Sequence, residues 1–270
     1  MEKVDRLGWA AGIRFDSYGV RMGIRVNDPG VMEHILPRLP LGWTPARGAV
    51  VDELFSVYCG RAPSGSAVRH FDLLYRGADR LVRTLDRDEL LDGVEGQVRL
   101  CVAEMATRRV FLHAGVVAWN GGAILIPGRS YSGKSRLVEA LVRRGATYYS
   151  DEYAVLDARA RVHPYATPLS RRDESGRAHR VSPESLGGPT ARPAVPVRKV
   201  VLTRYRAGAD WKPRQLTPGR ALLGLLDHAI PARRRPQDVL AALQRIVSSA
   251  PVYKSARGDA DAVAAALLDG

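Results

Sequence analysis

The segment Gly128–Ser135, with the sequence GRSYSGKS, combines the residue types and spacing that bind nucleotide phosphates. It fits the pattern G-x-x-x-x-G-K-[ST] at every fixed position, with an apolar strand predicted before it and a helix after it. The glycines let backbone N–H groups turn toward phosphate oxygens, the lysine neutralises phosphate charge, and the final hydroxyl binds Mg²⁺. The segment predicts a phosphate site whose contacts are Gly128, Ser130, Ser132, Gly133, Lys134 and Ser135.

Two adjacent carboxylates follow this loop after one helix, one turn and one predicted strand. Asp151 and Glu152 come directly after the strand-like segment Thr147–Ser150. Ligands of open α/β sheets bind at the carboxyl ends of strands, so the acids should lie beside the phosphate loop if the two strands are neighbours. One carboxylate would accept the proton of a substrate hydroxyl, and the other would help to hold Mg²⁺. The alternative interpretation is a solvated turn.

Three further residues could act on phosphate. His113 lies on the predicted strand that enters the hairpin before the phosphate loop and could sit beside the γ-phosphate, although a single histidine on an apolar strand is also a common core residue. Arg171 and Arg172 could clamp phosphate or substrate through charge-assisted hydrogen bonds. Two solvated arginines are the alternative, because residues 171–188 are polar, contain Gly, Ser and Pro, and are predicted to form a loop.

The elements that must position these residues form two predicted domains. Residues 1–108 contain hairpin-like strand segments, a short helix, and a long helix over residues 86–106 that should be interrupted or kinked near Gly93 and Gly96. This part is predicted to be a smaller α+β region. Residues 109–270 alternate strands with helices, which is typical of an α/β domain.

Two local signals frame the phosphate loop within the second domain. Asn120-Gly121 predicts a tight hairpin turn between the two strands that precede the loop. Gly145 predicts the end of the helix that follows the loop, because glycine readily adopts the left-handed conformation of a helix C-terminus. The predicted fold class is therefore α/β.

Composition restricts the setting in which this chemistry takes place. The chain has 270 residues, of which 46% are apolar and 26% charged, as in a folded globular protein. Its apolar runs are shorter than the roughly 18 residues that a membrane helix needs, and residues 1–25 lack the apolar core of a secretory signal. Two cysteines are too few for a disulfide scaffold. We therefore expect a cytoplasmic protein with no membrane association.

The net charge of +13 attracts polyanions. The basic residues are nevertheless spread along the chain rather than gathered into one stripe, so nucleic acid is not the expected partner. The phosphate-loop motif instead predicts that the bound anion is a nucleotide.

The order of the motifs resembles the catalytic core of HPr kinase/phosphorylase and of related HPr-kinase-like enzymes from peptide natural-product gene clusters. The resemblance covers residues 110–157: a histidine on a strand, a hairpin, the phosphate loop, a helix ending in Arg143-Arg144-Gly145, and the paired acid. Most phosphate-loop NTPases place their second acidic motif much further along the chain. The resemblance implies a phosphate-loop kinase core with a mixed sheet and flanking helices, and it suggests a homo-oligomer.

Carried over by position, the resemblance also implies roles for single residues. Lys134 would contact the phosphates, Ser135 would bind Mg²⁺, and Glu152 would aid the metal. Asp151 would be the general base on a substrate serine hydroxyl, and His113 would lie near the transferred phosphoryl group.

The predicted function is a kinase that uses ATP and Mg²⁺ to phosphorylate a Ser or Thr hydroxyl of a peptide, such as a natural-product precursor, or of a small protein. Residues 1–108 could select this acceptor. One alternative is a small-metabolite or nucleoside kinase. Another is a nucleotide-binding regulator or nucleic-acid-binding module without turnover.

Overall fold

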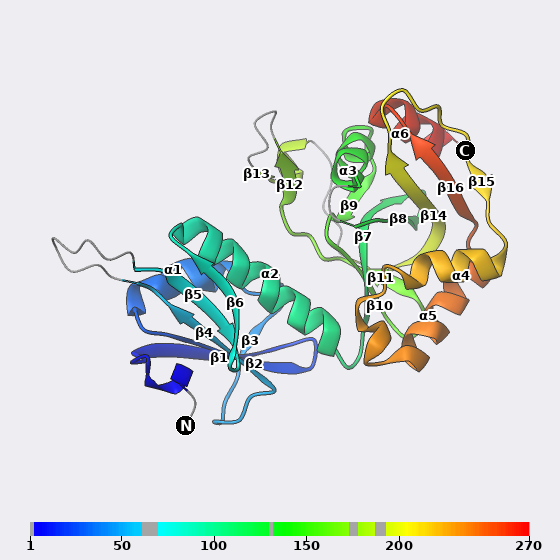
Figure 1. The fold of residues 1–270 in the computed structure, drawn as a ribbon. Coiled ribbons are helices and arrows are strands. Elements are labelled where there is room, and N and C mark those ends of the chain that lie inside the picture. Colours follow the sequence, from blue (N-terminus) through cyan, green and yellow to red (C-terminus); the bar gives the residue numbers. More distant parts are fainter. Residues whose placement is uncertain (1–2, 61–69, 130–131, 173–177, 187–192, 270) are drawn as a thin grey trace. The chain divides into compact units, whose positions relative to one another are not determined.

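The chain folds into two compact units, Met1–Thr107 and Arg108–Gly270, each of which combines a sheet with helices (Figure 1). The computed structural model describes residues 3–60, 70–129, 132–172, 178–186 and 193–269. Both main sheets contain parallel and antiparallel pairs, so the protein is of mixed α/β class. None of the helices in these described ranges is long and apolar enough to span a membrane.

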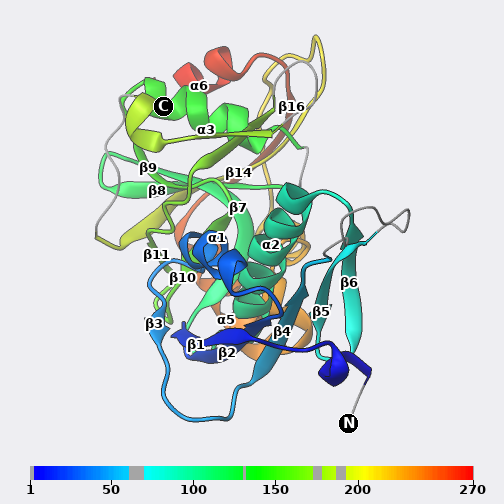
Figure 2. The same cartoon turned by 90° about the vertical axis from the view of Figure 1, so that its left-hand side faces the viewer.

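The first unit is a six-stranded sheet covered by helices on one face, as Figure 2 also shows. The strands lie in the order β3-β1-β2-β4-β5-β6, and the pair β2–β4 is parallel. Apolar side chains from the strands pack against the buried stripe of the long helix to form the core. The elements are β1 (Ala11–Ser17), β2 (Val20–Val26), β3 (Thr44–Pro45), β4 (Glu53–Tyr58), β5 (Asp72–Arg76), β6 (Asp79–Thr84), α1 (Met32–Ile35) and α2 (Arg87–Met105), with short 3-10 turns at Lys3–Arg6, Pro29–Val31 and Leu36–Arg38.

The predicted interruption of the long helix is wrong, because α2 runs continuously through both glycines. Its first turn is capped by Asp86, whose side chain accepts hydrogen bonds from the backbone N–H groups of Asp88 and Glu89. A Cβ atom on Gly93 would lie 2.8 Å from Val82 Cγ2 of β6. Glycine therefore lets the helix approach the sheet closely, and this packing outweighs the low helix propensity of glycine.

The second unit contains an eight-stranded sheet and a separate two-stranded hairpin. Its strands are β7 (Val110–Trp119), β8 (Gly122–Pro127), β9 (Thr147–Ser150), β10 (Tyr153–Leu156), β11 (Arg161–His163), β12 (Leu169–Arg172), β13 (Ala178–Val181), β14 (Val195–Tyr205), β15 (Arg214–Gln215) and β16 (Val252–Arg257). Its helices are α3 (Lys134–Arg143), α4 (Pro218–Leu226), α5 (Pro236–Ser249) and α6 (Ala260–Asp269), with 3-10 turns at Pro183–Leu186 and Ile230–Arg233.

The large sheet is the middle of three layers (Figure 1). Its central strands lie in the order β7-β8-β14-β16, with β8, β14 and β16 parallel to one another. Helices α3 and α6 pack on one face, and α4 and α5 pack on the other. Successive residues of β8 alternate between the two cores, as expected for a strand buried on both faces.

The hairpin predicted before the phosphate loop is confirmed. Strands β7 and β8 pair antiparallel from Trp119↔Gly122 to Ala114↔Pro127. Asn120 and Gly121 both have positive φ, 50° and 76°, as a tight turn of the primed type requires.

Strands β9 and β10 follow each other along the edge of β7 that is opposite β8. Ser150 pairs with Val116 and Tyr153 pairs with His113, so the Asp151–Glu152 bend interrupts one continuous line of pairing. The strand before the acids is therefore not a neighbour of the strand before the phosphate loop, because β7 lies between them.

The predicted loop after the acids contains regular structure. Strands β12 and β13 form an antiparallel hairpin with the register Leu169↔Val181 and Arg172↔Ala178. The loop prediction is wrong for these residues because cross-strand backbone hydrogen bonds, which composition does not reveal, order them.

Candidate functional site

The phosphate loop begins where β8 ends. The N–H of Gly128 donates to the carbonyl of His113 over 3.2 Å, which ties the start of the loop to β7. A Cβ atom on Gly128 would collide with the Ser132 hydroxyl, so a larger residue there would require the Ser132 side chain to move. Gly133 has φ +85° and precedes the first residue of α3, so the helix N-terminus points its free N–H groups toward the loop. Ser130 lies outside the described residues.

Lys134 and His113 meet at the helix N-terminus. The Lys134 Nζ atom lies 3.1 Å from His113 Nε2, and the lysine side chain is only 9% exposed. Burial lowers the pKa of Lys134, while the charges of Asp151 and Glu152 act in the opposite direction. Burial, with Lys134 and His228 nearby, lowers the pKa of His113 from 6.5 to about 4, so this imidazole is neutral at pH 7.

The acidic pair occupies a well-ordered bend. The Ser150 hydroxyl accepts hydrogen bonds from the N–H groups of Glu152 and Tyr153, at 3.1 and 3.0 Å. This turn breaks the strand alternation that would send the two carboxylates to opposite faces. Asp151 is only 6% exposed, so it is not part of a solvated turn, whereas Glu152 is half-buried.

A short stretch of β7 holds the two motifs in place. On one edge, the His113 carbonyl accepts from Gly128 at the start of the phosphate loop. On the other edge, the N–H of Ala114 donates to the Glu152 carbonyl over 3.1 Å. The structure therefore brings Lys134, His113 and the acidic pair together around one strand, although the acids and the loop are not on adjacent strands.

Two residues outside the sequence motifs donate hydrogen bonds to carbonyl groups of the phosphate loop. The N–H of Tyr205, at the end of β14, donates to the Ser132 carbonyl over 3.2 Å. Arg257, at the end of β16 and 1% exposed, donates from Nη2 to the Gly133 carbonyl. These bonds fix the carbonyl groups of Ser132 and Gly133, whereas the N–H groups of Gly128 and Ser132 donate to the carbonyls of His113 and Arg129.

Arg257 has little sequence signal. It ends the strand-like segment Val252–Arg257, and the only hint is that ligands of α/β sheets bind at the carboxyl ends of strands. Burial lowers its pKa, yet an arginine keeps its charge at any ordinary pH.

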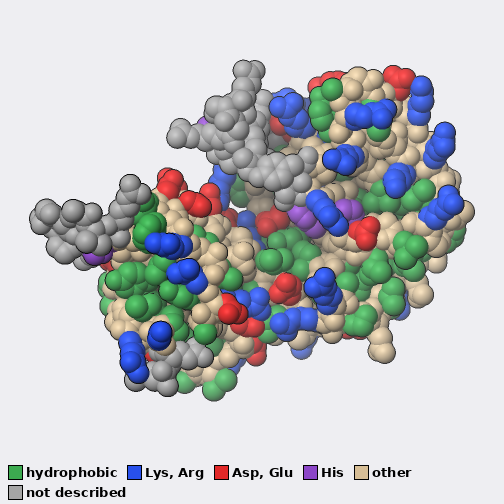
Figure 3. Space-filling model, in the orientation of Figure 1, with side chains coloured by type: hydrophobic (Ala, Val, Ile, Leu, Met, Phe, Trp, Pro, Cys, Tyr) green, Lys and Arg blue, Asp and Glu red, His purple; other side chains and the backbone are tan. Residues whose placement is uncertain are grey.

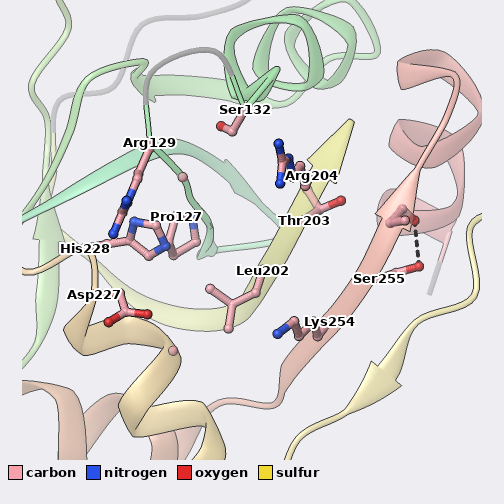
Figure 4. Close-up of a pocket in the computed structure, with 13 residues that line it drawn as sticks. Pro127, Arg129, Ser132, Leu202, Thr203, Arg204, Asp227, His228, Lys254 and Ser255 are labelled. Carbon is pink, nitrogen blue, oxygen red and sulfur yellow. Dashed lines mark hydrogen bonds between the residues drawn. The ribbon is translucent and has the colours of Figure 1, made fainter. Parts of the chain in front are cut away.

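A cavity of about 710 Å³ opens next to the loop, at the carboxyl ends of β8, β14 and β16 (Figure 4). His228 lines it, and the His228 carbonyl accepts a 2.8 Å hydrogen bond from the N–H of His113, so the cavity wall adjoins the Lys134–His113 pair. The sequence motifs gave no sign of this cavity. Its lining is Pro127, Gly128, Arg129, Ser132, Leu202, Thr203, Arg204, Gly224, Asp227, His228, Lys254, Ser255 and Ala256.

The positive charge of the protein is concentrated in the unit that carries this site. Residues 108–270 contain 27 Lys and Arg against 13 Asp and Glu, a net charge of +14, whereas residues 1–107 contain 14 against 15, a net charge of −1. Lys and Arg side chains are spread over the visible face of the second unit (Figure 3). Such a field raises the local concentration of anionic ligands such as nucleotides.

The residues predicted to hold Mg²⁺ have oxygen donors of the kind that this ion prefers. The Ser135 hydroxyl and the Glu152 carboxylate are hard oxygen donors, and Mg²⁺ is commonly held by one or two such groups together with substrate phosphates. Across the described ranges, no three His, Cys, Asp or Glu residues are grouped so that they could hold a metal ion. Arg171 and Arg172 end β12, and their role as a clamp stays a prediction.

No protein-family model matches the chain, and no curated protein sequence matches it. The HPr-kinase-like assignment therefore stays a prediction from the order of the motifs.

Proposed function

We propose that the second unit is a kinase that transfers the γ-phosphoryl group of Mg-ATP to a Ser or Thr hydroxyl of a peptide or small protein. One observation carries the proposal: Lys134 Nζ lies 3.1 Å from His113 Nε2, and the charges of both Asp151 and Glu152 act on that same ammonium group. The lysine of the predicted phosphate loop and a neutral histidine are thus in contact, and two candidate carboxylates lie near enough for their charges to act on the lysine. The serine or threonine acceptor is the part of the proposal that comes from the resemblance.

The residues of the candidate site have separate roles in the proposed phosphoryl transfer. The loop N–H groups and Lys134 neutralise charge on the transferred group, and His113 accepts a hydrogen bond from Lys134 and so orients it. The acceptor oxygen bonds to the γ-phosphorus while the bond to the β–γ bridging oxygen breaks and ADP leaves. Asp151 takes the hydroxyl proton. Ser135 and Glu152 would hold Mg²⁺, which neutralises phosphate charge when bound.

Replacement of Lys134 tests the proposal. Wild type and Lys134→Ala are incubated with Mg²⁺, γ-labelled ATP and a library of serine- and threonine-containing peptides, and ADP and labelled peptide are measured. We expect wild type to label peptides, and Lys134→Ala to lose turnover by orders of magnitude while it stays folded. Lys212→Ala, which removes an exposed lysine paired with Asp210 in the same unit, is the matched control.

Two results would contradict the proposal. Lys134→Ala with more than about a tenth of wild-type turnover would remove the phosphate loop from the reaction. Wild type that binds ATP but forms neither ADP nor labelled peptide would favour a nucleotide-binding regulator.

A further inference from the structure

We propose that the cavity beside the phosphate loop binds the nucleoside part of the nucleotide, and that the phosphate acceptor enters from the opposite side of β7. This inference rests on the proposed function, because it assumes that the loop holds the phosphates. It adds the residues that recognise the nucleoside and the direction from which the second substrate approaches.

The geometry of phosphoryl transfer separates the two substrates. The attacking oxygen and the leaving oxygen lie roughly in line on opposite sides of the transferred phosphorus. The candidate base, Asp151, lies on the edge of β7 that pairs with β9 and β10. The acceptor hydroxyl must be within hydrogen-bond reach of that base. The nucleoside must therefore extend toward the other edge of β7. Strands β8, β14 and β16 end on that side, and the cavity lies there.

The size and lining of the cavity suit a nucleoside. A volume of about 710 Å³ lies within the roughly 300–1,000 Å³ usual for small-molecule pockets. Leu202 and Lys254 extend from neighbouring parallel strands into the space, as Figure 4 shows, and Pro127 and Ala256 add apolar surface. The apolar part of this lining, formed by Leu202, Pro127 and Ala256, can accept the face of a planar base.

Three polar atoms in the lining need partners that a nucleotide can supply. Ser132 Oγ, Thr203 Oγ1 and His228 Nδ1 are buried and have no hydrogen-bond partner among the residues that the structure describes. A buried polar atom without a hydrogen-bond partner destabilises the protein, so a ligand that supplies the partner gains affinity. Phosphate oxygens, ribose hydroxyls and base nitrogens are groups that can satisfy these atoms.

Charged side chains line both ends of the cavity. Arg129 lies beside His228 on the loop side, and Arg204 extends toward Ser132, so these two cations are near the expected phosphates, whereas Lys254 lies further from the loop, beside Leu202 (Figure 4). Asp227 lies further along the wall, and its carboxylate has no hydrogen bond or ion pair within the described ranges. A carboxylate there can accept hydrogen bonds from ribose hydroxyls or from N–H groups of a base.

The test compares ligands with and without a nucleoside. Binding of ATP and of inorganic tripolyphosphate is measured by calorimetry for wild type, Ala256→Phe and Asp227→Ala. Ala256 lines the cavity, so phenylalanine fills the space. Ala207→Phe is the matched control, because Ala207 is exposed, lies in the same unit and is not part of the lining.

We expect Ala256→Phe to weaken ATP binding at least tenfold, and Asp227→Ala at least threefold. Tripolyphosphate binding should stay within twofold of wild type in both variants, which also shows that the loop is still folded. The Ala207→Phe control should bind both ligands as wild type does. If Ala256→Phe does not fold, Asp227→Ala alone tests the inference: its ATP binding should be at least threefold weaker while its tripolyphosphate binding stays within twofold of wild type.

The possible failures are distinguishable. ATP binding that is unchanged in both folded variants would overturn the inference and leave the proposed function standing. Unchanged ATP binding with loss of peptide phosphorylation would assign the cavity to the acceptor and would also overturn it. Wild type that binds neither ATP nor tripolyphosphate would overturn the proposed function itself.

Discussion

Lys134 Nζ and His113 Nε2 lie 3.1 Å apart at the N-terminus of α3. A charged lysine has three donors and no acceptor, so Nε2 must accept, and the His113 proton must be on Nδ1. The neutral state agrees with the pKa of His113, which burial, Lys134 and His228 lower to about 4. The loop lysine is thus oriented by a residue of β7 before any phosphate is bound.

The first prediction concerns acid stability. Because the folded-state pKa of His113 is about 4 and its ordinary pKa is 6.5, the unfolded chain takes up the proton first as pH falls. The stability contributed by neutral His113 is complete above pH 6.5 and is lost toward pH 4. We expect about 2 kcal/mol of this loss between pH 7.5 and 5.0.

Urea unfolding of wild type and His113→Gln at these two pH values measures this loss. The variant should lose about 2 kcal/mol less than wild type between them. His34→Gln, at an exposed position of the first unit, should lose as much as wild type. Equal losses in wild type and His113→Gln would show that His113 is not held neutral by its surroundings.

The second prediction separates the two acids. Asp151→Asn keeps the shape of the side chain but removes the proton acceptor, so kcat should fall by roughly 10²–10⁴ while ATP affinity is retained. Glu152→Gln should instead raise the Mg²⁺ concentration needed for activity, and added Mg²⁺ should partly restore turnover. Turnover as a function of Mg²⁺ is measured for both variants. Rescue of Asp151→Asn by Mg²⁺ would reverse the two roles.

The third prediction concerns the hydrogen bond from Arg257, at the end of β16, to the phosphate loop. Arg257→Met removes the donor to the Gly133 carbonyl, so the loop N–H groups are less well ordered for an anion. ATP and tripolyphosphate affinity should both fall about tenfold, in contrast to the cavity variants, because the defect is in the phosphate site. Arg257→Lys should recover part of the loss.

Thermal unfolding is recorded beside binding in this experiment, since Arg257 is fully buried. Arg206→Met changes an exposed arginine directly after β14 and is the control. Tripolyphosphate binding at wild-type strength in folded Arg257→Met would mean that the arginine only fills space.

The fourth prediction uses the two glycines of α2. A Cβ atom on Gly96 would meet nothing within 4 Å, so Gly96→Ala should stabilise the first unit by roughly 0.5–1 kcal/mol. A Cβ atom on Gly93 would lie 2.8 Å from Val82 Cγ2, so Gly93→Ala should destabilise it by about 1–3 kcal/mol. Urea unfolding of both variants checks the opposite signs. Stabilisation by both would mean that α2 can move away from β6.

Local features of the sequence determined the parts of the site that depend on backbone conformation. The spacing Gly128–Ser135 places the loop between a strand and a helix, and the structure has β8 and α3 there. The Asn120-Gly121 turn and the end of α3 before Gly145, where φ is 93°, were equally predictable. Each depends on a few neighbouring residues whose allowed φ and ψ angles are nearly fixed by residue type.

Only the tertiary structure decided which distant residues meet. Strand order placed β7 between the acids and the loop, so the contact between Lys134 and His113 depends on sheet pairing rather than on spacing along the chain. Arg257 reaches the loop from 124 residues away, and the cavity needs α4 and three parallel strands. Such contacts follow from how apolar faces bury one another over long sequence separations, which no local pattern encodes.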